Sequence, residues 1–428
     1  MKIQRDMAKP INKPGPIRRF FALLGPGLVT GAADDDPSGI VTYSIAGAQL
    51  GTAMLWTAML TFPLMGAVQM MCARIGMTTG MGLAAALRKK IPRSLLILVA
   101  LALFSANTIN IGADLSGMAD VSNLLSGINK SIFVLVFGVA IIVVTIRFKY
   151  NSIAAILKWL ALSLFAYVIT AFIARPHWPE VLAATFMPSW PSSHAQWSML
   201  VAILGTTISP YLFFWQASQE VEVEKARGQR TSASRRGADT SELKDRGIDV
   251  ETGAFFSNMI MYFIILTTAL TLHRGGVTHL DTSKEAVKAL EPLAGPFAAW
   301  LYALGMVGVG LLAIPTLAGS AAYVYSETFG MRQGLDEKLR RARAFYAIMG
   351  LSILFGMVLT FMPIKPMDAL LWSAIINGLL APFVLVGVLL VACDQKVMQG
   401  QTSSYLALGM VGLTTLGMFV AGIANFFL

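Results

Sequence analysis

The sequence predicts an all-α polytopic membrane protein with eleven transmembrane helices. Of the 428 residues, 56% are hydrophobic and only 13% are charged, which is about half the charged fraction of an average soluble protein. Eleven apolar runs are long enough to cross a bilayer as helices. Two of these runs are interrupted near the middle by polar residues and a proline. The composition, the number of runs and the two interruptions together define the expected class.

The apolar runs divide the chain into two groups of five and a final single run. They lie at about 20–50, 52–75, 93–126, 131–147, 152–174, 196–219, 251–273, 297–325, 344–361, 368–391 and 404–427. The expected organisation is a cytoplasmic tail at 1–19, a first five-helix repeat at 20–174, an outside loop at 175–195, a second five-helix repeat at 196–391 with a cytoplasmic loop at 220–250, and an eleventh helix at 392–428.

The positions of lysine and arginine predict the orientation in the membrane. Cytoplasmic loops of membrane proteins carry an excess of these residues. Most of them fall in the 1–19 tail, the 220–250 loop and the other loops of the same side, whereas the opposite loops hold only Lys130, Arg175, Arg274, Lys284, Lys288 and Lys365. We therefore expect a plasma (inner) membrane protein with a cytoplasmic N-terminus and an outside C-terminus. This placement accounts for the net charge of +10, so nucleic acid is not an expected partner.

The first run contains three consecutive carboxylates, Asp34, Asp35 and Asp36, followed by Pro37. One charge at the centre of a bilayer costs roughly 2.5–3.5 kcal/mol on insertion scales, and the proline removes a backbone donor and disfavours helix at the residue before it. The pattern predicts a helix that is broken in mid-membrane. Irregular backbone survives at that depth only where it is buried or lines a wet cavity, and acids at such a break are suited to binding a cation.

The sixth run repeats this anomaly. The segment from Gly205 through Thr206 and Ser209 to Pro210 interrupts an apolar stretch with a glycine, hydroxyl groups and a proline. A single proline kink is common in membrane helices. Two interruptions, each in the first run of a group of five, are the best sequence indication of a transporter site at the interface of two repeats.

Asp36 is the prime candidate for a metal ligand, because it directly precedes the proline at the break. Carbonyl groups near Thr206 and the hydroxyl of Ser209 would complete a set of oxygen ligands, which suits hard cations such as Mg²⁺, Ca²⁺ and Mn²⁺. Asp34 and Asp35 cannot face the same point as Asp36, since successive helical residues turn by about 100°. They are either supporting acids beside the site or water-facing acids near the cytoplasmic half.

Further polar residues lie in the third, sixth and tenth runs. Asn107, Asn110 and Asp114 share roughly one face of the third helix; because neutral amides cannot relay protons as carboxylates do, the stripe is expected to line the pathway or to bond neighbouring helices. Asn377 could line the same cavity or bond to a neighbouring helix. Glu220, at the end of the sixth run, is interpreted as part of a solvated helix end, with a cation-attracting mouth as the less favoured alternative.

At these residues the chain resembles the NRAMP superfamily of divalent metal transporters. The first-helix signature of the family is Asp-Pro-Gly-Asn, and this chain has Asp36-Pro37-Ser38-Gly39; the sixth-helix signature is Ala-x-x-Met-Pro-His, and this chain has a run from Thr206 through Ser209 and Pro210 to Tyr211. The resemblance covers the whole chain in order. It implies the LeuT-type fold, with two inverted repeats of five helices, helices 1 and 6 broken, and an added eleventh helix.

The departures from the family pattern carry information. The metal-binding asparagine of the family is replaced by Gly39 and its metal-binding methionine by Ser209, while its two sixth-helix histidines correspond to Tyr211 and Gln216. Its acidic third-helix pair corresponds to Asn107 and Asn110. The pattern is similar to the NRAMP-related magnesium transporter branch, which implies transport of Mg²⁺ and Mn²⁺ with little or no proton coupling.

The leading hypothesis is therefore a divalent cation transporter that moves Mg²⁺, and with it Mn²⁺, by alternating access without proton coupling. The alternatives are a proton-coupled Mn²⁺/Fe²⁺ transporter of the ordinary NRAMP type and a transporter of an organic solute with the same fold. An enzyme, such as an intramembrane aspartyl protease that uses the acids of Asp34–Asp36 together with Asp114, is disfavoured. The expected partners are divalent metal ions and the lipid bilayer; no resident cofactor and no obligate protein partner are expected.

Overall fold

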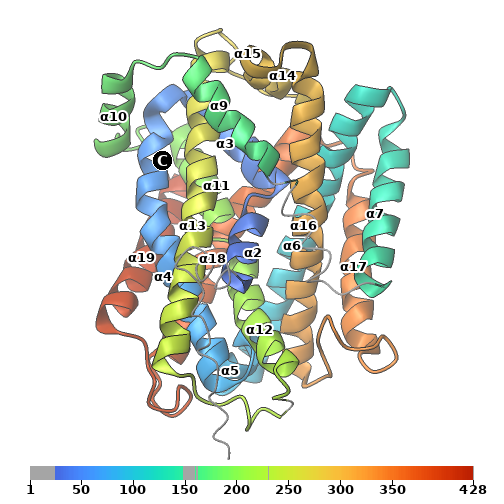
Figure 1. Cartoon of the computed structure of the whole chain (residues 1–428), viewed down its shortest axis with the longest axis vertical. Helices are drawn as coiled ribbons and strands as arrows, with labels where there is room; N and C mark the ends of the chain where they lie inside the picture. The colour runs from blue at the N-terminus through green and yellow to red at the C-terminus, as the bar shows by residue number, and fades with distance from the viewer. Residues whose placement is uncertain (1–24, 148–159, 161, 230, 428) are drawn as a thin grey trace, which may run out of the picture.

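The computed structural model describes residues 25–427 except 148–159, 161 and 230. The expected tail at 1–19, the beginning of the first run and most of the first half of the fifth run lie outside the described residues. Within the described ranges all regular elements are helices. The long helices run side by side along the long axis of the molecule (Figure 1).

The first run is broken as expected. Helix α2 (Pro26–Asp34) ends at the carboxylate cluster, and helix α3 (Pro37–Leu50) begins at the proline that follows it. Asp35 leaves helical geometry and Asp36 is extended, so the chain is irregular over these two residues. We call residues 35–36 the first break. Asp36 becomes the N-cap of α3, a position at which an aspartate side chain satisfies a free backbone N–H group.

The sixth run is broken in the same way. Helix α11 (His194–Thr207) ends before Ile208, and helix α12 (Pro210–Ala226) begins after Ser209. Residues 208–209 form the second break. Both breaks end on a proline at the first helical position, where the missing N–H group of proline costs no helical hydrogen bond.

The other helices of the bundle surround these four half-helices. In chain order they are α4 (Leu55–Thr79), α6 (Arg93–Ser126), α7 (Lys130–Arg147), α9 (Phe165–Ile173), α13 (Thr240–Thr268), α16 (Ala298–Phe329), α17 (Arg343–Leu359), α18 (Pro366–Ala392) and α19 (Tyr405–Phe427). In Figure 1 α7 and α17 stand at one side of the bundle and α19 at the other. Short helices lie in the connections: α5 (Leu83–Leu87), α10 (Trp178–Phe186), α14 (Ser283–Val287) and α15 (Glu291–Ala294).

Eight segments of the described chain are long and apolar enough to cross a membrane, and α9 with its preceding turn and α17 are shorter apolar helices. The fifth run is described only in part, so the count of eleven stays a prediction. The connection around 220–250 is shorter in the structure than in the sequence-based division, because α12 continues to Ala226 and α13 begins at Thr240. The loop at 175–195 contains α10.

Glycines allow the half-helices to approach their neighbours closely. A Cβ atom on Gly31 of α2 would lie 2.5 Å from the carbonyl of Gly253 on α13, and a Cβ on Gly205 of α11 would lie 2.0 Å from the Ala374 carbonyl on α18. Small residues that let membrane helices touch along their backbones are typical of such interfaces. The two breaks are thereby held inside the bundle.

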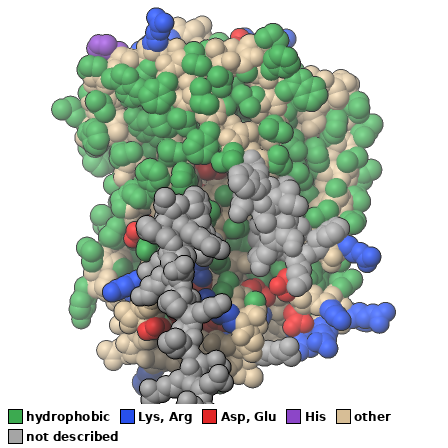
Figure 2. Space-filling model, viewed as in Figure 1, with side chains coloured by type: hydrophobic (Ala, Val, Ile, Leu, Met, Phe, Trp, Pro, Cys, Tyr) green, Lys and Arg blue, Asp and Glu red, His purple; other side chains and the backbone are tan. Residues whose placement is uncertain are grey.

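The surface matches a membrane protein. Figure 2 shows hydrophobic side chains covering most of the upper part of this face of the molecule, with most of its lysine and arginine side chains in the lower half. Large apolar side chains are also exposed along α7, α17 and α19, for example Leu135, Phe355 and Leu416. Such exposure is expected for residues that face lipid.

Candidate functional site

The carboxylate of Asp36 is held in a fixed position at the first break. Its Oδ1 accepts a hydrogen bond from the backbone N–H of Gly39 at 2.7 Å, and its Oδ2 accepts one from Nδ2 of Asn110 on α6 at 3.0 Å. The side chain is buried. Each oxygen still has a lone pair free, so a carboxylate oriented in this way can accept further donors or coordinate a cation.

Asn110 is itself oriented by the tenth run. Oγ of Ser373 on α18 donates to Oδ1 of Asn110 at 2.8 Å, and the hydroxyl of Ser38 lies 3.1 Å from that of Ser373. The amide of Asn110 must therefore direct its NH₂ group at Asp36. The chain Ser373–Asn110–Asp36 joins α18, α6 and the first break. Asn110 therefore bonds to neighbouring helices, which was one of the two alternatives for this stripe, and a role in lining the pathway stays a prediction.

Asp114 lies one helical turn beyond Asn110 on the same face of α6 and is fully buried. It is close enough to Asp36 to interact with it electrostatically, and the N–H of Ser38 lies nearby. No described group forms a hydrogen bond of good geometry with either of its carboxylate oxygens. Burying a charged group without partners is costly, and Asp114 places such a carboxyl group, without a well-aligned partner among the described residues, beside the hydrogen-bonded Asp36.

The second break supplies oxygen atoms only. Oγ of Ser209 lies 2.6 Å from the carbonyl oxygen of Gly205 and 2.7 Å from that of Thr206, to which it donates. The hydroxyl group therefore helps to satisfy the carbonyls that the interrupted helix leaves free. Both of these carbonyls and the Ser209 hydroxyl keep lone pairs that can coordinate a hard cation.

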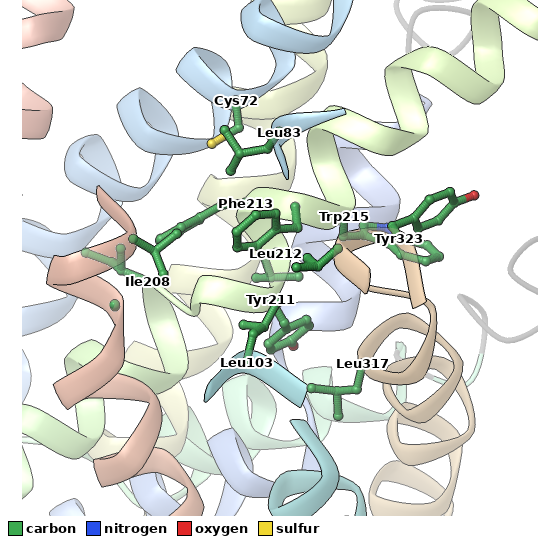
Figure 3. Close-up of a cluster of buried hydrophobic side chains, with 14 of the residues drawn as sticks. Cys72, Leu83, Leu103, Ile208, Tyr211, Leu212, Phe213, Trp215, Leu317 and Tyr323 are labelled. Carbon is green, nitrogen blue, oxygen red and sulfur yellow. The ribbon is translucent and has the colours of Figure 1, made fainter. Parts of the chain in front are cut away.

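Two tyrosines join the breaks to each other. The hydroxyl of Tyr211, at the start of α12, donates to the carbonyl of Ala33 on α2 at 2.9 Å. The hydroxyl of Tyr43 on α3 accepts from Thr206 at 3.1 Å and lies 3.2 Å from the hydroxyl of Thr207. Each half of one broken helix therefore contacts a half of the other, which brings the expected ligand-bearing segments together. Figure 3 shows Tyr211 within the surrounding hydrophobic cluster, near Leu103.

Asp34 and Asp35 face a different neighbour from Asp36. Oγ of Ser257 on α13 donates to Oδ2 of Asp34 at 2.7 Å and lies 3.2 Å from Oδ1 of Asp35. Both aspartates are buried, so the alternative of water-facing acids is wrong and that of supporting acids remains. Sequence reasoning did not identify Ser257 or Ser373; Ser257 stands beside Asn258 as a polar pair in an apolar run, which could have drawn attention to it.

The remaining expected site residues occupy varied positions. Gly39 contacts Asp36 through its N–H, and a Cβ there would lie 3.4 Å from the Tyr43 ring. Asn107 donates to the carbonyl of Leu317 on α16 at 2.9 Å rather than to Asp36. Asn377 is buried on α18, with no hydrogen-bond partner for its Oδ1 among the described residues.

Gln216 belongs to a network at the end of the bundle where α12 ends. It accepts a hydrogen bond from Oγ1 of Thr30 at 2.6 Å and donates to Glu220 at 2.8 Å. Nε of Arg246 lies 2.9 Å from the same Glu220 carboxylate, and its Nη1 lies 2.6 Å from Asp249. Interpreting Glu220 as a solvated helix end was therefore wrong: it is buried, because α13 covers it and supplies its ion-pair partner.

Asp249 fixes the beginning of α2. Its carboxylate accepts hydrogen bonds from the backbone N–H groups of Gly25 at 2.7 Å, Gly27 at 2.8 Å and Leu28 at 3.0 Å. The first N–H groups of a helix have no partner within the helix, and a carboxylate there is favoured by the helix dipole. Arg246 thus links α12 and α2 through two buried carboxylates. We call Glu220, Arg246 and Asp249 the tether.

Within the described ranges, no group of three or more His, Cys, Asp or Glu side chains is placed to hold a metal ion by itself. An ion at the breaks would therefore be bound by few carboxylates, together with carbonyl and hydroxyl oxygens or water. That arrangement suits hard divalent cations.

Comparison with known protein families identifies the family of this chain. The family described as "Nramp: Natural resistance-associated macrophage protein-like" matches residues 27–428. The chain belongs to the Nramp family. It is therefore an integral membrane transporter and not an enzyme.

Curated relatives and solved structures agree with this assignment. Proteins called "Divalent metal cation transporter MntH" from Caldanaerobacter subterraneus subsp. tengcongensis and Erwinia tasmaniensis are 25% and 27% identical, covering 90% and 70% of this chain and 87% and 71% of their own lengths. The Eremococcus coleocola manganese transporter, solved in complex with an aromatic bis-isothiourea substituted compound, superimposes with a TM-score of 0.73 at 18% identity, over 97% of this chain and 88% of its own. These names support the family and do not single out its magnesium-transporting branch.

The fold extends beyond the Nramp family. MhsT in complex with L-phenylalanine superimposes with a TM-score of 0.57 at 13% identity, over 94% of this chain and 96% of its own. This likeness confirms the LeuT-like fold expected from the resemblance. It shows the fold alone, since a manganese transporter and a protein in complex with L-phenylalanine share this architecture with the chain.

Proposed function

We propose that the chain carries divalent metal cations across the membrane by alternating access and that Mn²⁺ is a transported ion. The observation that supports this most directly is the buried Asp36 carboxylate, which Gly39 and Asn110 hold at a helix break opposite a second break. Carboxylate, hydroxyl and carbonyl oxygens suit Mn²⁺. The names of the relatives, divalent metal cation transporter and manganese transporter, agree with this cargo.

Mg²⁺ is a second candidate cargo, and one specific observation favours it. Ser209 occupies the position at which the Nramp pattern has a methionine, and its hydroxyl bonds to two carbonyls of the same break. A thioether selects softer transition metals, whereas a hydroxyl does not. Mg²⁺ usually keeps part of its water shell and needs few protein ligands, which Asp36 and the oxygen atoms of the second break would supply.

Transport without proton coupling also remains a proposal. The neutral amides Asn107 and Asn110 support it, because they cannot carry a proton as a carboxylate can. Asp114 opposes it, because it is an ionisable group beside Asp36. Measuring the internal pH during metal uptake distinguishes the two mechanisms.

An organic solute is a weaker cargo hypothesis. An amino acid presents its own carboxylate, and the buried Asp36 and Asp114 would repel it at the first break. Among the described residues of the first break, no cationic or neutral group is placed to bind the carboxylate of such a solute. The fold similarity to MhsT therefore does not extend to this chemistry.

The test uses the full chain purified and reconstituted in liposomes. Mn²⁺ influx is followed by quenching of an internal metal-sensitive dye, with an internal pH dye in parallel and Mg²⁺ as competitor. We expect saturable Mn²⁺ uptake that Mg²⁺ reduces in proportion to its own transport. Uptake no faster than in protein-free liposomes would contradict the proposal, and acidification driven by Mn²⁺ would establish proton coupling.

A further inference from the structure

Asp34 and Asp35 converge on a single hydroxyl group. Oγ of Ser257 lies 2.7 Å from Oδ2 of Asp34 and 3.2 Å from Oδ1 of Asp35. Asp34 is 0% exposed, Asp35 is 5% exposed and Ser257 is 1% exposed. A hydroxyl has one proton to donate, so Ser257 can satisfy one of these carboxylates at a time.

The rest of the cluster is electrostatically unbalanced. The ion pairs of the described chain include neither Asp34 nor Asp35. Oδ1 of Asp34 has no hydrogen-bond partner among the described residues, although it is buried. A buried carboxylate without a partner is costly, and in proteins such groups are paired or coordinate a metal.

The backbone adds to the negative potential at this point. Helix α2 ends at Asp34, and the last carbonyl groups of a helix have no partner within it. The C-terminal end of a helix carries a partial negative charge that favours cations nearby. Asp34 and Asp35 stand at this end, whereas Asp36 stands at the N-terminal end of α3. The electrostatic potential of the backbone is therefore more negative on the Asp34 and Asp35 side of the break than on the Asp36 side.

The carboxylates at the first break face two different helices. Asp36 and Asp114 interact with each other on the side of α6, and Asp36 is bonded there by Asn110. Asp34 and Asp35 face α13 through Ser257. When all four of these buried carboxyl groups are ionised, they carry four negative charges, which two divalent cations would neutralise.

We propose that Asp34, Asp35 and Ser257 form a second divalent-cation site between α2 and α13, separate from the site at Asp36. Its ligands are the two carboxylates and the serine oxygen, together with water or freed carbonyl groups at the end of α2. This site rests on the proposed cation transport, since it would bind the same transported ion at a position next to the site at Asp36. The Gly31–Gly253 approach keeps α13 close enough to α2 for both helices to contact one ion.

The number of bound ions tests this site. The purified full-length chain is titrated with Mn²⁺ alone, and free Mn²⁺ is measured by its electron paramagnetic resonance signal. We expect two bound ions in the wild-type chain. Asp34→Asn and Asp35→Asn should each reduce the number to one, and Asp36→Asn should also leave one ion, bound at the second site. Asp34→Asn combined with Asp36→Asn should bind none.

The control is Asp120→Asn, which alters another buried aspartate of α6, paired with Lys130 far along the helix from the breaks. It should keep two ions. The ion that each single variant retains shows that the variant is folded. A wild-type chain that binds one ion overturns the proposal, as do two ions retained in both Asp34→Asn and Asp35→Asn. Failure of the proposed cargo is distinct, because it would give no bound ion in any chain.

Discussion

The Nδ2 atom of Asn110 donates a hydrogen bond to Oδ2 of Asp36 over 3.0 Å. This contact joins the middle of a continuous helix to the carboxylate that caps the start of α3. Because Ser373 holds the other end of the amide, the direction of the Asp36 carboxylate is set by residues of α6 and α18. The affinity of Asp36 for a substrate ion would thus depend on the positions of α6 and α18.

Replacing Asn110 should weaken ion binding without removing the ligand. In metal sites, loss of a group that orients a ligand typically costs 10–100-fold in affinity. We expect Asn110→Ala to raise the Mn²⁺ concentration for half-maximal uptake by about tenfold. The measurement is the concentration dependence of Mn²⁺ influx into liposomes. Asn107→Ala is the control, because Asn107 bonds to the Leu317 carbonyl; an equal effect of both variants would contradict the role of Asn110.

Ser209 should control the preference between hard and soft metals. Ser209→Met introduces a thioether at the second break, and soft ligands favour soft ions. We expect Cd²⁺ to compete with Mn²⁺ at a concentration at least about tenfold lower than in the wild-type chain, a change of about 1.4 kcal/mol in binding.

Ser209→Ala is the matched control for this substitution. It removes the hydroxyl that bonds to Gly205 and Thr206 but adds no sulfur, so it should not increase competition by Cd²⁺. If Ser209→Ala and Ser209→Met change Cd²⁺ competition alike, the side chain at position 209 does not contact the ion.

The tether should keep α2 against α13 and α12. Arg246 is 11% exposed and pairs with Glu220 and Asp249, which are 2% and 0% exposed. Removing one partner of a buried ion pair leaves uncompensated charge and costs about 3–5 kcal/mol. In Arg246→Ala the carboxylates of Glu220 and Asp249 lose their partner. We expect α2 to move away from α12 and α13 so that water can solvate these charges, and water then reaches the first break from the end where the tether lies.

Thiol labelling measures this release. Ala33 is buried next to the first break, so Ala33→Cys should react slowly with a water-soluble maleimide in a Cys393→Ser background, which removes the exposed native cysteine. Adding Arg246→Ala should accelerate the reaction at least about tenfold if the tether contributes 1.4 kcal/mol or more to closure. Arg227→Ala breaks the exposed pair with Glu242 and should leave the rate unchanged. Equal rates in all three chains would refute the role of the tether.

The helices α2 and α13 lie so close together at Gly253 that a methyl group added there should destabilise their packing. A Cβ on Gly253 would lie 2.4 Å from the carbonyl oxygen of Gly27, so one helix must move. Overpacking of this kind costs typically about 1–3 kcal/mol. We expect Gly253→Ala to lower the thermal unfolding temperature of the purified chain. Gly247→Ala lies on the same helix with nothing within 4 Å of the new atom and should not lower it; a larger loss for Gly247→Ala would contradict this packing.

The sequence predicted the features that depend on local chemistry. A proline after a carboxylate cluster breaks a helix wherever the helix lies, so the break at Asp36 and Pro37 follows from the chain alone. The same holds for Ser209 and Pro210.

Features that depend on packing could not be predicted in this way. Glu220 is a helix-end glutamate in the sequence, and only the position of α13 shows that Arg246 covers and neutralises it. Asn107 and Asn110 lie on one helical face, yet the first bonds to α16 and the second to Asp36, because the two residues sit at different depths against different neighbours. Ser257 became part of the site only through the contact between α2 and α13.

The most direct test of the account is Mn²⁺ uptake by Asp36→Asn in liposomes. The substitution keeps the size of the side chain and removes its charge, and Asp120→Asn makes the same change away from the breaks. We expect Asp36→Asn to take up Mn²⁺ no faster than protein-free liposomes, while Asp120→Asn retains saturable uptake. Saturable uptake at the wild-type rate in Asp36→Asn would contradict the assignment of Asp36 as the ion ligand.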